Sequence, residues 1–374
     1  MIEQKRLGDI ATYINGFAFK PEDRGTVGLP IIRIQDLTGN AYDLGFYAGN
    51  YPERIEINDG DVLISWSASL GVYVWDKGKA LLNQHIFKVV FDKCEVNREY
   101  FVYAVRYKLK EMESKTHGAT MKHIVKKDFD NTLIPFPTLE EQENIANLLD
   151  KISTIILVRQ QQLQKLDELV KARFVELFGD PISNPMNWNK RTLKEVCTKL
   201  NDGTHFSPES FSMGDYKYIT AKNIKASGFD FSNITYVPEA VHRPIFERCN
   251  PEQGDVLYIK DGATTGIAIV NTLKEEFTLL SSVALLKQNR NVINGYFLAA
   301  LLNNADMYSD IRNNMGGAAI TRLTIAKLNA VKVIVPPLDL QNRFAAFVEQ
   351  VDKSKVAVQK SLDEASSPRL SMMK

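Results

Sequence analysis

The chain has 374 residues, of which 44% are hydrophobic and 24% charged, and its formal net charge is +1. This length and apolar content are enough for two cores of ordinary domain size. The near-zero charge excludes an acidic mimic of DNA, and it means that any DNA-binding face must be a local basic patch.

The three cysteines, Cys94, Cys197 and Cys249, lie far apart and form no CxxC pair. This spacing favours reduced thiols over a disulfide framework or a structural zinc site. The first ten residues, MIEQKRLGDI, lack the apolar core of a signal peptide, and no apolar run reaches the roughly 18 residues of a membrane span. We therefore expect a soluble, cytoplasmic protein without a membrane partner.

The first 136 residues are expected to form a globular part of mixed α and β structure. Short β-rich runs such as LPIIRI at 29–34 and GDVLI at 60–64 lie between turn-forming residues, and residues 97–113 have the pattern of a helix. A glycine-containing turn, GATMK at 118–122, precedes two prolines, Pro135 and Pro137. These prolines end the last strand.

A long helix is predicted over residues 138–179. Thr138 and Glu141 fit a capping box at its start, and Gly179 followed by Pro181 fits its end. Apolar residues repeat every seven positions along it, which is typical of a coiled-coil seam that also includes Arg159 and Arg173. The apolar members of this seam are Ile145, Leu149, Ile152, Ile156, Leu163, Leu166, Val170 and Leu177.

Residues 180–335 repeat the first part. GDVLY at 254–258 matches GDVLI, GAAITR at 317–322 matches GATMK, and PPLDLQ at 336–341 matches PTLEEQ at 137–142. The three motifs recur in the same order at a nearly constant offset, which chance matches would not do. Residues 294–313 are predicted to form the helix equivalent to 97–113.

The C-terminal segment, 338–374, is predicted to be a second long helix that Pro368 ends early. Its apolar stripe consists of Phe344, Val348, Val351, Val358 and Leu362. Because each long helix has one stripe that needs a partner, we expect the two to pair antiparallel. The predicted fold is α+β, with two globular α/β-mixed parts separated by two long antiparallel coiled-coil helices and related by a pseudo-two-fold internal repeat.

No catalytic motif is evident. The chain has no phosphate-binding glycine loop, no nucleophile elbow and no histidine pair with metal-ligand spacing. His117 and His123 flank the first glycine turn and are interpreted as surface or DNA-facing imidazoles. Asp92 with Glu113-Ser114-Lys115 is a faint match to metal-dependent nucleases, but the second copy has no counterpart. We predict neither catalytic residues nor metal ligands.

The ordered set of motifs, present twice, resembles the specificity subunits of Type I restriction-modification systems. So does the end of the first long helix, VKARFVELFGDP at 170–181. The resemblance implies two target-recognition domains, 1–136 and 180–335, that bind the halves of a bipartite double-stranded DNA site. It implies that the spacer helices, 138–179 and 338–374, set the gap and bind two methyltransferase (modification) subunits. S-adenosylmethionine, ATP and Mg²⁺ would then belong to modification and restriction subunits, and this chain would bind no cofactor.

DNA contact requires hydrogen-bonding side chains on projecting loops, with Lys and Arg near the phosphates. Lys122 and Arg322 occupy matching places in the two glycine turns and are expected to contact phosphate. Trp66 is interpreted as a partly buried aromatic. The candidates in the first part are Lys20, Arg24, Arg33, Gln35, Ser65, Ser67 and Lys122. Those in the second are Thr204, His205, Lys217, Lys222, Asn223, Lys225, Lys260, Thr264, Thr265 and Arg322.

Two other classes of protein stay open on the sequence alone. One is a metal-dependent nuclease built from a duplicated domain, and it should cut DNA with Mg²⁺ without help. The other is a two-headed interaction protein that binds no DNA. A non-catalytic specificity subunit should bind DNA weakly alone and strongly with its methyltransferase partner, without cutting.

Overall fold

The computed structural model describes residues 3–40, 43–114, 123–313 and 323–371. It divides into two compact units. Unit 1 contains the chain up to Arg159 together with the segment from Ser361, and unit 2 is Gln160–Lys360. Each unit is described by itself. Each unit contains several helices together with mainly antiparallel sheets, so the fold is α+β as predicted.

Unit 1 is built on a four-stranded antiparallel sheet with the order β2-β9-β6-β7. A second sheet, β4-β3-β8-β5, contains one parallel pair, β3 with β8. The strands of unit 1 are β1 (Gln4–Arg6), β2 (Thr12–Asn15), β3 (Leu29–Ile32), β4 (Phe46–Tyr47), β5 (Glu56–Ile57), β6 (Val62–Ser65), β7 (Gly71–Val74), β8 (Ala80–Leu82), β9 (Ile86–Val90) and β10 (Leu133–Pro135). Its helices are α1 (Leu7–Ile10), α2 (Ile34–Thr38), α3 (Arg98–Ser114), α4 (Lys126–Asp130) and the start of α5 (Leu139–Phe178).

Unit 2 repeats this architecture. Its four-stranded antiparallel sheet has the order β12-β20-β17-β18, and β13 pairs in parallel with β19 as β3 does with β8. Its strands are β11 (Lys190–Thr192), β12 (Cys197–Asp202), β13 (Tyr216–Ile219), β14 (Ile224–Lys225), β15 (Gly228–Phe229), β16 (Thr235–Val237), β17 (Val256–Ile259), β18 (Ala268–Val270), β19 (Phe277–Leu279), β20 (Val283–Gln288) and β21 (Lys332–Ile334). Its helices are the end of α5, α6 (Leu193–Val196), α7 (Glu239–Arg248), α8 (Gly295–Leu302), α9 (Ala305–Asn313), α10 (Ile325–Ala330) and α11 (Leu338–Ser371), whose last residues from Ser361 belong to unit 1.

The repeated G-D-V-L motif forms the same turn in both units. Gly60 and Gly254 have φ +91°, a backbone conformation that favours glycine. The carboxylates of Asp61 and Asp255 each accept a backbone N–H at 2.8 Å from three residues earlier in the chain. The motif therefore determines how the central strand begins, and its recurrence reflects the fold.

The glutamine that ends both PTLEEQ at 137–142 and PPLDLQ at 336–341 joins each long helix to its globular part. Gln142 Oε1 accepts the backbone N–H of Asn97 at 2.9 Å, and Gln142 Nε2 donates to the carbonyl of Pro137 at 2.9 Å. Gln341 forms the equivalent bonds with Asn294 at 2.9 Å and Pro336 at 2.8 Å. Both glutamines are buried.

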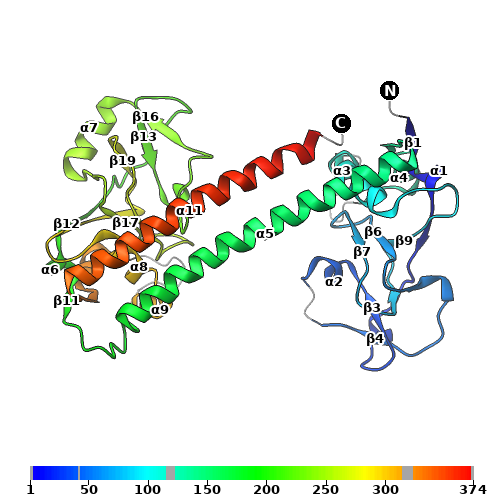
Figure 1. Cartoon of the computed structure of the whole chain (residues 1–374), viewed down its shortest axis with the longest axis horizontal. Coiled ribbons are helices and arrows are strands. Elements are labelled where there is room, and N and C mark those ends of the chain that lie inside the picture. The colour runs from blue at the N-terminus through cyan, green and yellow to red at the C-terminus, as the bar shows by residue number, and fades with distance from the viewer. Residues whose placement is uncertain (1–2, 41–42, 115–122, 314–322, 372–374) are drawn as a thin grey trace. The chain divides into compact units, whose positions relative to one another are not determined.

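Helix α5 runs unbroken from Leu139 to Phe178, as Figure 1 shows. Its Thr138–Glu141 capping box is present, with Glu141 Oε2 accepting the Thr138 N–H at 3.0 Å. In unit 2 it lies antiparallel to α11: Asp167 pairs with Lys355 at 2.7 Å, while Phe174 contacts Phe344 at a ring separation of 5.7 Å. The predicted antiparallel pairing of the helices therefore holds for this stretch.

Part of the predicted seam packs on globular structure. Leu149 lies in the core of unit 1 with Ile145 packed against it, and Phe344 and Val348 lie in the core of unit 2 with Val170 and Leu177 packed against them. Ile152 and Val351 are buried, whereas Ile156, Leu163, Leu166, Val358 and Leu362 are half-buried. A seven-residue apolar period does not distinguish a helix partner from a domain core, because either can cover the same stripe.

Two predictions about helices are wrong. The segment 294–313 is two helices, α8 and α9, because Asn303 ends the first by bonding to both backbone groups of Ala268 at 2.7 and 2.9 Å. Pro368 does not end the last helix, which continues to Ser371. A proline removes one backbone donor and crowds the carbonyl four residues earlier, but only three residues of the helix follow Pro368, so little helix remains to be disrupted.

Candidate nucleic-acid interface

The two units present matching strand ends where several predicted DNA contacts lie. The backbone N–H of Trp66 donates to the His85 carbonyl at 3.1 Å, and the Trp66 carbonyl accepts the backbone N–H of Ile124 at 3.0 Å. In the same way, the backbone N–H of Lys260 donates to the Ser282 carbonyl, and the Lys260 carbonyl accepts the N–H of Leu323, both at 2.9 Å. Trp66 and Lys260 are therefore equivalent positions. The predicted phosphate contacts Lys122 and Arg322 lie outside the described residues, directly before these junctions in the sequence.

Several predicted contacts are buried and bonded inside the protein. Ser65 Oγ donates to the Ser69 carbonyl at 2.6 Å, and Thr265 Oγ1 donates to the Gly262 carbonyl at 2.6 Å. Asn223 Oδ1 accepts the Thr220 N–H at 3.1 Å. These geometries give the side chains structural roles. The buried candidates are Arg33, Ser65, Ser67, Thr204, Asn223, Lys260 and Thr265.

Arg33 is the clearest case in unit 1. Its guanidinium pairs with Asp36 at 3.1 Å and with Asp43 at 3.5 Å, and it also donates to the Asp43 carbonyl. The hydrogen bond that Arg33 Nε donates to Asp36 is the main cause that raises the pKa of Arg33. An arginine held in this way at the start of α2 fixes a loop, so we interpret Arg33 as a structural residue.

Lys260 is the corresponding case in unit 2. Only 1% of it is exposed, and its Nζ lies 3.3 Å from Asp202 Oδ2 and 2.9 Å from Asp261 Oδ2. A buried lysine between two carboxylates neutralises them and fixes their positions. We therefore interpret Lys260 as a support for neighbouring residues.

The remaining described candidates face solvent. The Lys20 side chain is 73% exposed and that of His205 is 55% exposed. Lys217 differs, because its side chain is half-buried and pairs with the more exposed Glu275 at 2.8 Å. The exposed candidates are Lys20, Arg24, Gln35, His205, Lys222, Lys225 and Thr264.

Two exposed apolar side chains escaped the sequence analysis. Val27 is 72% exposed and Met213 is 82% exposed, in loops that enter β3 and β13 respectively. Both loops are fixed by backbone bridges, Gly25 with Phe46 and Phe211 with Tyr236. Apolar side chains at such tips can contact thymine methyl groups. A search for donors and acceptors alone could not find them.

Trp66 is half-buried, as predicted: its Nε1 donates to Asn15 Oδ1 at 3.2 Å and its ring stacks on Phe87. The cysteines are free thiols. Burial raises the pKa of Cys197 and of Cys249 to about 12, so both thiols stay protonated at neutral pH.

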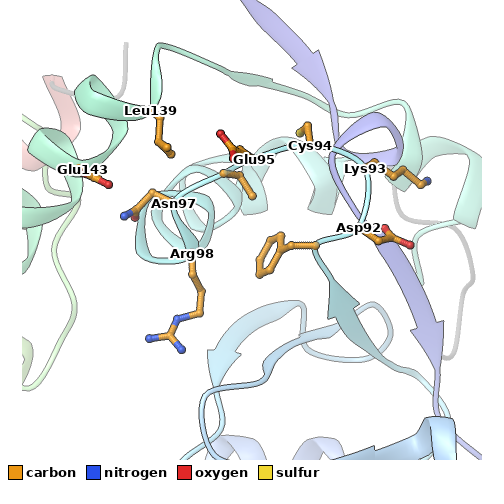
Figure 2. Close-up of a pocket in the computed structure, with 10 residues that line it drawn as sticks. Asp92, Lys93, Cys94, Glu95, Asn97, Arg98, Leu139 and Glu143 are labelled. Atoms are coloured by element: carbon orange, nitrogen blue, oxygen red, sulfur yellow. The ribbon is translucent and has the colours of Figure 1, made fainter.

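A shallow hollow of about 680 Å³ lies in unit 1 between the loop after β9 and the first turns of α5. Figure 2 shows Glu143 on one side of it and Asp92 and Lys93 on the other. Asp92 accepts bonds from the Thr12 N–H at 3.0 Å and the Thr12 hydroxyl at 2.7 Å, and the hydroxyl bond is the main cause that lowers its pKa. Asp92 thus joins the loop after β9 to the start of β2.

Among the described residues, no cluster of three or more His, Cys, Asp or Glu side chains could hold a metal ion. Lys115, the last member of the faint nuclease match, lies outside the described residues. In the same part of the chain, no helix is long and apolar enough to cross a membrane.

The duplicated α+β units and their long helices define a class of protein. Residues 2–168 and 185–365 match the family model described as Type I restriction modification DNA specificity domain, so the chain belongs to this family. It is a DNA specificity subunit of a Type I restriction-modification system, as the resemblance in the sequence implied.

Individual relatives agree with this membership. The chain is 22% identical to the Type I restriction enzyme EcoBI specificity subunit of Escherichia coli, and the match covers 96% of this chain and 81% of the relative. It is also 22% identical to the MjaVIII specificity subunit of Methanocaldococcus jannaschii, covering 80% and 74% of the two chains.

Solved structures share the fold. The S subunit of a Type I restriction-modification system from M. genitalium aligns with a TM-score of 0.63 at 17% identity, covering 100% of this chain and 95% of that one. A chain from a study of complex assembly and conformational transition of the type I R-M system aligns with a TM-score of 0.56 at 18% identity, covering 99% and 96%.

Proposed function

We propose that the chain recognises a bipartite double-stranded DNA site, with residues 1–136 binding one half and residues 180–335 the other. The main support is that each unit contains a four-stranded sheet of the same order, β2-β9-β6-β7 in one and β12-β20-β17-β18 in the other. Each of these sheets has a separate hydrophobic core. Two separately folded copies with different loops can bind two different short sequences.

We further propose that the spacer helices, 138–179 and 338–374, bind two modification subunits. Support comes from apolar side chains that α5 leaves in solvent within unit 1, since exposed apolar patches commonly mark protein interfaces. These side chains are Leu148, Ile155, Leu157 and Val158. The partner subunits, including restriction subunits in the full complex, would hold S-adenosylmethionine, ATP and Mg²⁺.

In this proposal the chain itself is not an enzyme. The engagement of Asp92 with Thr12 gives a structural reason for its presence, so it offers no support for the alternative of a nuclease. Incubation of the purified chain with DNA and Mg²⁺ tests this point: the proposal predicts binding without strand cleavage.

Domain exchange tests the bipartite site. Residues 1–136 are replaced by the equivalent part of a relative, and methylated adenines are mapped in cells that also carry the methyltransferase. One half of the target should change while the other half and the gap stay the same. A simultaneous change of both halves would mean that the units do not recognise DNA separately.

A further inference from the structure

Three polar side chains of unit 2, His205, Asp202 and Lys260, form a connected chain. His205 Nε2 lies 3.1 Å from Asp202 Oδ1, and Lys260 Nζ lies 3.3 Å from Asp202 Oδ2. Asp202 and Lys260 are 4% and 1% exposed, whereas the imidazole projects into solvent. The imidazole of His205 is therefore exposed but hydrogen-bonded to a buried ion pair, Asp202 with Lys260.

The carboxylate of Asp202 is held on several sides, and Arg248 Nη1 also lies 4.0 Å from its Oδ1. Both of its oxygens are engaged, and Arg248 of α7 donates to the backbone carbonyls of Asp202 and Gly203. Lys260 also pairs with Asp261 at 2.9 Å. The charged groups that face this site are therefore Asp202 on β12, Lys260 and Asp261 at the end of β17, and Arg248 on α7.

The backbone that carries His205 is equally fixed. The Thr204 N–H donates to the Leu279 carbonyl at 2.8 Å, and the Thr204 carbonyl accepts from Ser281 at 2.8 Å. A Cβ on Gly203 would lie 1.9 Å from that Leu279 carbonyl oxygen, so only glycine allows this approach. The imidazole is therefore held from both its backbone and its ring, as a specificity contact requires.

The hydrogen bond to Asp202 determines what the imidazole offers to solvent. A carboxylate only accepts, so Nε2 must carry a proton in either charge state of the ring. The outward nitrogen is then Nδ1, which has no hydrogen-bond partner within the described residues. In the neutral ring Nδ1 is an acceptor, and in the imidazolium it becomes a donor.

We propose that His205 is a specificity-determining residue of the second half-site, whose Nδ1 accepts a hydrogen bond from the exocyclic amino group of adenine or cytosine in the major groove. Asp202 is its positioning residue, and Lys260 holds Asp202. This inference rests on the proposed function, because it assigns one contact within the DNA site of unit 2. Those amino groups are the donors that bases present in the major groove.

Unit 1 has different residues at the positions of His205, Asp202 and Lys260. Asn15 and Trp66 stand where unit 2 has Asp202 and Lys260, and they form a neutral hydrogen bond at 3.2 Å. Counting from the matching glycines, Gly16 and Gly203, the position of His205 is occupied by Ala18. His205→Ala therefore installs the residue of the other copy at an exposed position, which leaves the fold intact.

The test measures affinity of the full chain with its modification subunits for the cognate duplex and for duplexes changed at each base of each half-site. At about pH 7.5 we expect His205→Ala to lose about fivefold in affinity for the cognate duplex. It should also lose discrimination at one adenine or cytosine of the second half-site, with the first half-site unaffected. Asp202→Asn should show the same loss of discrimination.

The salt dependence of binding separates a base acceptor from a phosphate contact. His205→Ala should leave the slope of affinity against salt concentration unchanged, because a bond to a base amino group releases no counterion. An equal loss of affinity at every duplex together with a shallower salt slope would overturn the inference and assign His205 to phosphate. Unchanged discrimination in His205→Ala would also overturn it, with the bipartite target intact. Absence of any bipartite target would instead contradict the proposed function.

Discussion

Gln142 and Gln341 show how a single side chain can explain a repeated motif. Each satisfies the N–H at the start of a preceding helical segment and a proline carbonyl at the start of a long helix. The bonds join sequence segments about 45 residues apart, so they fix where the long helix leaves the globular part.

Gln142→Ala should lower the free energy of unfolding by about 1–3 kcal/mol, because the buried N–H of Asn97 would lose its acceptor. Gln161→Ala, at an exposed position on the same helix, is the matched control and should change stability by less than about 0.5 kcal/mol. Denaturant unfolding curves of the two variants decide this. Equal changes would mean that the glutamine bridge adds nothing to stability.

The sequence identified which residues repeat but not all their roles. Lys260, Thr265 and Asn223 look like DNA contacts because they are polar residues near turns, yet each is bonded internally. Their burial depends on strands far away in the chain. The same pattern predicts His205 as a DNA contact, and its hydrogen bond to Asp202 is visible only in the structure.

Helix α7 places a histidine in the interior of unit 2. His242 is fully buried, with Nδ1 2.8 Å from Thr278 Oγ1 and Nε2 3.3 Å from Glu276. Its ring stacks on Tyr216 at a centroid distance of 3.7 Å. Burial is the main cause that lowers the pKa of His242, and the hydrogen bond to Glu276 partly opposes it.

This shift makes stability depend on pH. The unfolded chain binds the proton more readily than the folded one, so the contribution of His242 is complete above about pH 6.5 and is lost as the pH falls through the lowered pKa. The free energy of unfolding should therefore drop on acidification from about pH 7.5 to about pH 5.5, and less so in His242→Gln. Denaturation at both pH values measures it; identical drops would exclude His242 as the cause.

Among the elements, periodicity predicted the long helices and their antiparallel pairing well. Helix α5 begins at its capping box and ends at Phe178, directly before Gly179, because both signals are local. The break between α8 and α9 escaped prediction because Asn303 is held by Ala268, a contact 35 residues distant. The residues next to Asn303 in the sequence do not indicate that Ala268 will lie beside it.

The molecule as a whole is a duplication, and its long helix should set the distance between the two half-sites. Inserting four residues after Gln162 adds about 6 Å and turns the following segment by about 40°. At about 3.4 Å per base pair, the target should keep its half-sites with a gap longer by one or two base pairs. Methylation mapping of the variant gives the gap directly.

A two-residue insertion at the same point is the control. It turns the helix by about 200°, which carries the apolar stripe away from its partner and should abolish binding. Four residues interrupt the seven-residue period only mildly, and local unwinding can absorb them. An unchanged gap with full activity in the four-residue variant would mean that the helices do not measure distance.

We propose that two copies of one fold recognise two halves of one DNA site. Genome-wide mapping of methylated adenines in a host that carries this chain and its methyltransferase is the decisive measurement. We expect one motif made of two short specified sequences separated by a fixed number of unspecified base pairs. A single continuous motif, or methylation without any sequence preference, would contradict it.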